Sequence, residues 1–171
     1  MLIQKNKTMR KLVMFGFIVA AFIACRPEAY QDIGEPYSVI TGIDGKWSLS
    51  VVEIEDRSFP QWETRDVSDY FVGPLSQNEV DIEFNADAKS YQITAVNLDG
   101  LPFTSINGTY AFDDEEYPSN LYLFAPGSSD TTTVGLGSMV RAIDPELKFQ
   151  ELKSSCDEVY ARYIYTFNRS N

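Results

Sequence analysis

The stretch EVDIEF, residues 79–84, decides the fold because polar and apolar side chains alternate along its whole length. In a β-strand successive side chains point to opposite faces, so the three apolar residues form one face and the three acidic residues form the other. Residues 85–88 (NADA) favour a turn, and the alternation resumes over residues 90–97. The two segments therefore predict an antiparallel hairpin.

The same alternation recurs in short segments that are separated by Gly, Pro, Asn and Asp, a spacing typical of an all-β barrel or sandwich. The first expected strand, near residues 46–55, changes phase at Val51 and Val52, which predicts a β-bulge. The last, residues 159–167, is apolar on both faces apart from Arg162 and Thr166, so we expect it to be central or to close a barrel. Four more strands are expected around residues 106–112, 121–123, 134–136 and 147–149.

One segment has the features of a short helix. Asp66–Phe71 begins with a residue that favours the N-cap position, and acidic residues lie in its first turn, where the helix dipole favours them. Eight strands and one short helix after the first strand predict an all-β fold, a small antiparallel eight-stranded barrel. Closing the sheet also removes exposed strand edges.

The N-terminus has the features of an export signal. Four basic residues precede Leu12–Ala24, which is thirteen residues without a charge. A helix that crosses a bilayer needs about 20 apolar residues, so this run is too short to span, but a short run after a basic start is typical of a signal peptide. We expect a signal peptide over residues 1–24, a flexible tether over 25–43 and the barrel domain over 44–171.

Ile23-Ala24-Cys25 resembles the lipobox of bacterial lipoproteins, although Phe22 replaces the leucine that is usual three positions before the cysteine. The resemblance implies that Cys25 becomes a lipidated first residue. The protein would then be anchored to the outer membrane, at its periplasmic face or at the cell surface. An ordinary secretory signal cut nearby is the alternative. If Cys25 is lipidated, Cys156 is left alone and we expect no disulfide.

Charge and composition narrow the function classes. The first 24 residues contain four of the 14 Lys and Arg and none of the 25 Asp and Glu, so the remaining chain has a formal net charge of −15. Phosphate backbones would repel such a chain, so we expect no nucleic-acid partner. There is no histidine, which removes the commonest general base and the usual zinc ligands. We expect no catalytic residue, no cofactor and no metal.

Two acidic segments bear on this expectation. Paired carboxylates support glycoside hydrolysis, but Glu79, Asp81 and Glu83 alternate with apolar residues and are expected to face water. Asp113–Glu116 contains enough carboxylates for calcium, but it lacks the spacing of a calcium-binding loop, and a solvated hairpin tip is expected there. Asp130-Thr131-Thr132 resembles a bacterial O-glycosylation site.

Gly45-Lys46-Trp47 at the start of the first strand resembles the Gly-x-Trp signature of lipocalins, and it precedes a series of hairpins. Together with the lipobox, this makes the chain similar to lipocalin-like lipoproteins of bacteria. The resemblance implies that Trp47 plugs the closed end of the barrel beneath a late arginine, either Arg169 or Arg162. It also implies an envelope location and ligand binding, without naming a ligand.

A group of aromatic residues lies in the long connection after the first strand, where lipocalin barrels carry the lid of their open end. We expect these residues either to bind a ligand or to seal the barrel: Phe59, Trp62, Tyr70 and Phe71. The leading hypothesis is that the barrel end binds a small apolar or amphipathic molecule or a glycan fragment. The alternative is a non-enzymatic structural or accessory subunit that docks on an envelope protein.

Overall fold

The computed structural model describes residues 39–57, 63–73, 75–138, 140 and 144–170, all within the unit formed by Tyr37–Asn171. In these residues nine strands form one antiparallel sheet, with very little helix. The strands are β1 (Gly45–Asp56), β2 (Glu63–Asp66), β3 (Asp81–Asn85), β4 (Ser90–Thr94), β5 (Asn107–Phe112), β6 (Asn120–Phe124), β7 (Thr131–Leu136), β8 (Glu146–Ser155) and β9 (Glu158–Arg169). The helical segments are α2 (Val39–Gly42) and the 3₁₀ turn η1 (Ser68–Tyr70).

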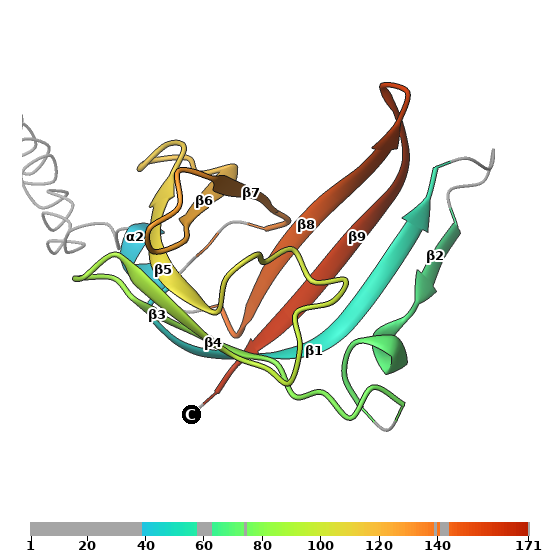
Figure 1. Ribbon diagram of the computed structural model, residues 1–171, viewed down its shortest axis with the longest axis horizontal. Helices are drawn as coiled ribbons and strands as arrows, with labels where there is room; N and C mark the ends of the chain where they lie inside the picture. The colour runs from blue at the N-terminus through green and yellow to red at the C-terminus, as the bar shows by residue number, and fades with distance from the viewer. Residues whose placement is uncertain (1–38, 58–62, 74, 139, 141–143, 171) are drawn as a thin grey trace, which may run out of the picture. The chain divides into compact units, whose positions relative to one another are not determined.

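The sheet closes on itself through its first and last strands. Strand β9 pairs with β8 along one edge and with β1 along the other, so β1 and β3–β9 form a closed eight-stranded meander (Figure 1). The predicted class, a small antiparallel eight-stranded barrel of the lipocalin type, is therefore confirmed. The last strand closes the barrel, one of the two roles that its apolar faces predicted.

Strand β1 has two partners on its other edge. Its first residues, Gly45–Ser48, pair with β3, whereas Glu53–Asp56 pair with β2. Between these halves the register with β9 shifts from Leu49 to Val51, so the predicted bulge is present, slightly earlier than expected. Strand β2 was not predicted because all four of its residues are exposed, and no apolar alternation marks it.

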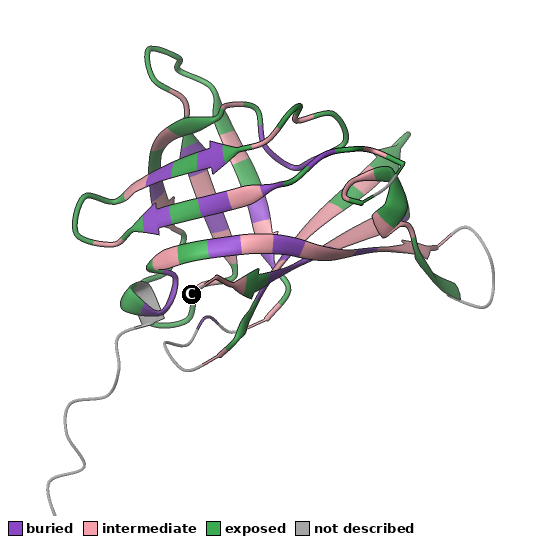
Figure 2. Cartoon of the chain, turned by 90° about the horizontal axis from the view of Figure 1, so that it is seen from below, coloured by how far each residue is buried: buried purple, intermediate pink, exposed green. Residues whose placement is uncertain are grey.

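In the part that the structure describes, the interior of the barrel is filled by aliphatic side chains and by a cluster of aromatic rings. Buried and exposed residues alternate along the strands (Figure 2). Phe149 is central, because its ring centroid lies 6.4 Å from that of Phe84, 5.9 Å from Phe103 and 5.5 Å from Phe167. These contacts are edge-to-face, and each fully buried ring contributes roughly 1.5–3 kcal/mol relative to exposure.

One end of the barrel is closed by Trp47, which is only 1% exposed. Its indole Nε1 donates a hydrogen bond to the carbonyl of Ile43 at 2.7 Å. The guanidinium carbon of Arg169 lies 4.3 Å from the centroid of the Trp47 ring. The same guanidinium donates to the carbonyls of Gly42 and Asp44, both at 2.9 Å, so it ties the final strand to the chain that enters β1.

The glycine of Gly-x-Trp has a physical explanation at this closed end. Gly45 has a φ of +105°, which L side chains rarely adopt, and an added Cβ would lie 3.3 Å from Nη1 of Arg169. The other arginine considered for this role, Arg162, points elsewhere: its Nε donates to Glu55 at 2.9 Å. Arg169 is therefore the residue that lies over Trp47.

Two sequence-based boundaries differ from the structure. The tether was expected to extend to residue 43, but Val39–Gly42 forms a helical turn and Ile43 is completely buried under Trp47. The helix expected over Asp66–Phe71 is only the 3₁₀ turn η1, because Asp66 still pairs with Glu53 as part of β2. An Asp66 carboxylate oxygen accepts the backbone N–H of Ser68 at 2.9 Å, which starts a tight turn rather than a helix.

Strands β8 and β9 are joined by the tightest turn of the barrel wall. Ser155 pairs with Glu158, so only Cys156 and Asp157 form the turn, with φ values of 50° and 67°. Two consecutive residues with positive φ are typical of a type I′ turn, whose twist matches that of the strands it connects. Cys156 is exposed and free at this tip.

Replacing Arg169 with alanine is expected to destabilise the barrel by about 2 kcal/mol, since it removes a cation–π contact and two hydrogen bonds made by a charged group. Urea denaturation of the purified chain would measure the loss. Lys89→Ala is the matched control, because Lys89 forms an exposed ion pair with Glu115 at 3.4 Å and should cost little. Equal stability of the two variants would contradict the structural role of Arg169.

Candidate functional site

Four strands extend beyond the closed part of the barrel. Strand β3 leaves β1 at Ser48, and β7 pairs with β8 only at Gly135 and Leu136, so the distal halves of β1, β8 and β9 continue without these neighbours. Strand β2 joins them at the edge of β1 (Figure 1). The result is a four-stranded extension, in the order β2-β1-β9-β8, at the end of the barrel opposite Trp47.

The inner face of this extension carries an apolar centre. Tyr163 of β9 lies directly opposite Ile54 of β1 on one side and Glu151 of β8 on the other. Tyr163 and Ile54 are both half-buried, whereas Tyr165, two residues further along β9, is fully buried. The rings of Tyr163 and Tyr165 are nearly parallel, at 19° and 6.2 Å between centroids. Tyr163 therefore lies where the packed interior meets the mouth of the barrel.

Phe71, from the turn after η1, covers this end. Its ring meets those of Tyr163 and Tyr165 edge-to-face, at centroid distances of 6.2 and 5.9 Å. Below it, the Tyr165 hydroxyl donates to the carbonyl of Gly100 at 2.7 Å and lies 3.3 Å from a carboxylate oxygen of Glu151. Burial raises the pKa of Tyr165, and the nearby Glu151 carboxylate raises it further, so this hydroxyl stays protonated.

Charged pairs flank the apolar centre on both sides. On the β8 side, Lys153 and Glu151 form an ion pair at 2.6 Å, and the Lys153 ammonium lies 6.0 Å from the centroid of the Tyr163 ring. On the β2 side, Arg65 lies 3.7 Å from Asp56. All four side chains are partly exposed, so their polar groups can reach a bound molecule. We call this surface the mouth platform, defined by Ile54, Phe71, Tyr163, Glu151 and Lys153.

The four aromatic residues predicted for ligand binding have different outcomes. Phe59 and Trp62 lie outside the described residues. Phe71 packs on Tyr163 and Tyr165, whereas its neighbour Tyr70 is 76% exposed and turns away from the core. Tyr163 was not among the predicted site residues, because residues 159–167 are apolar on both faces apart from Arg162 and Thr166 and nothing in the pattern singles out one ring. The place where β7 leaves β8 decides that this particular ring is half-exposed.

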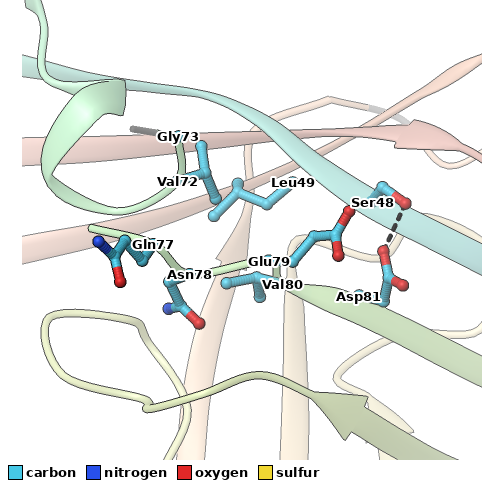
Figure 3. A pocket seen from close by; sticks show the side chains of 9 residues that line it. All are labelled: Ser48, Leu49, Val72, Gly73, Gln77, Asn78, Glu79, Val80 and Asp81. Carbon is cyan, nitrogen blue, oxygen red and sulfur yellow. Dashed lines mark hydrogen bonds between the residues drawn. The ribbon is translucent and has the colours of Figure 1, made fainter. Parts of the chain in front are cut away.

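A second surface feature is a groove of about 430 Å³ where β1 changes partner from β3 to β2. Figure 3 shows Ser48, Glu79 and Asp81 at one end of it, with the apolar side chains of Leu49 and Val72 nearby. Ser48 Oγ donates to a carboxylate oxygen of Asp81 at 2.5 Å. Gln77 and Asn78 complete the polar lining.

The Asp81 carboxylate of the groove is held by two neighbouring side chains. Lys46 pairs with Asp81 at 2.7 Å, and Glu79 is exposed. Burial acts to raise the pKa of Asp81, but the hydrogen bonds from Lys46 and Ser48 outweigh it and hold that pKa below its ordinary value. A catalytic acid would need the opposite shift, so Asp81 is suited to holding β1 and β3 together rather than to donating a proton.

The acidic segment Asp113–Glu116 lies at a hairpin tip. The carboxylate of Asp113, its first residue, accepts several hydrogen bonds from the loop. Asp113 accepts hydrogen bonds from the backbone N–H groups of Asp114, Ser119 and Asn120 at 2.9–3.0 Å, and from the Asn120 side chain at 2.9 Å. These donors, led by the Asn120 backbone, lower the pKa of Asp113 to about 2. Asp113 is therefore a structural residue of the turn.

No protein-family model matches the chain, and no curated protein matches it in sequence. The fold defines the class, an all-β, eight-stranded barrel of the lipocalin type, and an aromatic platform lies at the end opposite Trp47. In the part of the chain that the structure describes, no helix is long and apolar enough to cross a bilayer. The same residues contain no cluster of three or more potential metal ligands among His, Cys, Asp and Glu.

Asp113→Asn should destabilise the protein in a pH-dependent way. The pKa of Asp113 is about 2 in the folded chain against an ordinary value of 3.8, so its carboxylate stabilises the fold fully above about pH 4. That contribution is lost as the pH falls towards 2. Denaturation midpoints measured between pH 7 and pH 2.5 should show a gap between the wild type and the variant that narrows below pH 4.

Asp87→Asn, at an exposed position of the turn between β3 and β4, is the control for this experiment. The gap between this variant and the wild type should change less over the same pH range. A constant gap for Asp113→Asn would show that its charge is not what stabilises the turn.

Proposed function

We propose that this protein is a lipid-anchored component of the cell envelope whose mouth platform binds a small apolar or amphipathic molecule or a glycan fragment. The observation that carries the proposal is the half-buried ring of Tyr163, which lies beside Ile54 and under Phe71 between two charged pairs. Ligand sites typically combine such an apolar surface with a few polar groups that set orientation.

The energetics are compatible with binding at this place. Each Å² of apolar surface removed from water contributes roughly 25 cal/mol before the costs of association. The rings of Phe71, Tyr163 and Tyr165 support one another, so little side-chain freedom is lost when a ligand contacts them. The charged pairs add directional hydrogen bonds at the rim, which favour a ligand with both apolar and polar parts.

The proposed role is binding rather than catalysis. The chain contains no histidine, and the carboxylate of Asp81 is held by Lys46 and Ser48. The location is proposed from the sequence alone: Cys25 lies outside the described residues, and the lipobox that it ends supports lipidation and attachment to the outer membrane. Several acyl chains on one residue would give firm anchoring.

A second function, docking on an envelope protein as an accessory subunit, is supported by the packed interior of the barrel and by a different surface. Tyr70 and Leu75 are 76% and 71% exposed, and both line one shallow hollow next to η1. Exposed apolar side chains that lie together often mark protein interfaces. Crosslinking in intact cells through a photoreactive residue at position 70 would identify such a partner.

Tyr163→Ala is expected to weaken binding at the mouth platform at least tenfold. The test uses the chain from residue 25 onward, with a panel of oligosaccharides and an uncharged fluorescent probe for apolar sites, Nile red. Tyr122→Ala is the matched control, because Tyr122 is a half-buried tyrosine that points outward between the buried Leu121 and Leu123. If neither the oligosaccharides nor the fluorescent probe bind, or if the Tyr163→Ala and Tyr122→Ala variants bind them equally well, the proposed site is contradicted.

Mass spectrometry of the protein purified from its own cells tests the anchor. The expected product lacks residues 1–24 and carries acyl chains on Cys25, and Cys25→Ala should move the protein out of the membrane fraction. The Cys156→Ala variant is the control and should stay with the membrane. An unmodified Cys25 in the wild-type protein would exclude lipid anchoring through this residue.

A further inference from the structure

The proposed function leaves the chemical class of the ligand open. The geometry of the mouth platform favours one class of ligand over another. We propose that the mouth platform binds a neutral saccharide, whose apolar ring face stacks on Tyr163 while its hydroxyls contact the charged rim. This inference rests on the proposed function and adds a choice between two ligand classes. Three features of the structure support this choice: the side chains packed below the platform, the polar groups next to Tyr163, and the negative charge around the platform.

The space below the platform is occupied by side chains in the described part of the interior. Tyr165 is fully buried, and its hydroxyl is bonded to the carbonyl of Gly100. Deeper in the barrel, the rings of Phe103, Phe149 and Phe167 contact one another at centroid distances of 5.5–6.4 Å. An acyl chain is held by burying its CH₂ groups, so it needs a long apolar channel. The three phenylalanine rings fill the part of the interior that they span.

The platform itself is short, with polar groups close to its aromatic centre. Glu151 is directly opposite Tyr163, and Lys153 lies near the Tyr163 ring. A carboxylate and an ammonium side by side supply hydrogen-bond acceptors and donors within the width of one sugar ring. A pyranose has an apolar face of C–H groups and a rim of hydroxyls, so it matches an aromatic ring with polar neighbours.

The charge around the platform disfavours anionic amphiphiles. The two ion pairs on the rim, Arg65–Asp56 and Lys153–Glu151, each have no net charge. Glu63 on β2 lies opposite Asp56 and adds a negative charge. The chain after residue 24 has a formal net charge of −15, because only ten of the 14 basic residues remain against 25 acidic ones. A fatty acid carboxylate would therefore be repelled on its approach, whereas a neutral saccharide would not.

The experiment compares two ligand classes on the chain from residue 25 onward, which contains the whole unit Tyr37–Asn171. One arm titrates neutral oligosaccharides selected from a glycan array, and the other titrates palmitate and the uncharged amphiphile hexadecanol. Circular dichroism first establishes that each variant is folded. The expected result is saccharide binding that Tyr163→Ala weakens at least tenfold, that Tyr163→Phe preserves within about threefold, and that Tyr122→Ala leaves unchanged.

Lys153→Gln keeps the inference testable if Tyr163→Ala does not fold. It should weaken saccharide binding severalfold, because it replaces the ammonium of the rim while the aromatic surface stays intact. Binding of palmitate or hexadecanol that depends on Tyr163, without saccharide binding, would overturn the saccharide assignment and leave the proposed site in place. Binding in neither arm would overturn the proposed function itself. Saccharide binding unaffected by both variants would place the site elsewhere and overturn the inference.

Discussion

The structure depends on one backbone ladder, the antiparallel pairing of β1 with β9. This pairing joins nine residue pairs, from Trp47 and Arg169 at one end to Asp56 and Ala161 at the other. It closes the sheet, brings Arg169 over Trp47, and continues beyond the closed barrel as the centre of the four-stranded extension. Without it the eight strands would form an open sheet with two exposed edges.

The bulge in β1 links this ladder to the mouth. Side chains alternate between faces, so a strand without the register shift at Leu49–Val51 would turn Val52 and Ile54 to the outside. With the shift, Trp47 and Leu49 face the closed half and Ile54 faces inward next to Tyr163. The strand also bends, which allows β3 to pair with its first half and β2 with its second. The plug and the platform are thus two ends of a single strand.

The sequence was sufficient for the barrel strands because each one directs apolar residues inward at every second position. It was insufficient where the exposure of a side chain depends on which other segment of the chain packs against it. The strand expected over residues 106–112 begins at Asn107, and Ile106 just before it is 56% exposed. Phe71 and Tyr70 are adjacent aromatics, and only the direction of the turn at η1 decides which one packs. The exposure of Tyr163 depends on where the β7–β8 pairing ends, and that pairing joins segments that are distant in the sequence.

The turn at Cys156 and Asp157 has a consequence for how the barrel assembles. It joins strands of ten and twelve residues through two residues, so the β8–β9 hairpin closes a very short loop. Ser48 and Ser170, which meet where β1 joins β9, are 122 positions apart. Loop-closure entropy grows with this separation, and folding slows as contacts become less local. We therefore expect the β8–β9 hairpin to form early in folding. The barrel should close last, when β1 pairs with β9.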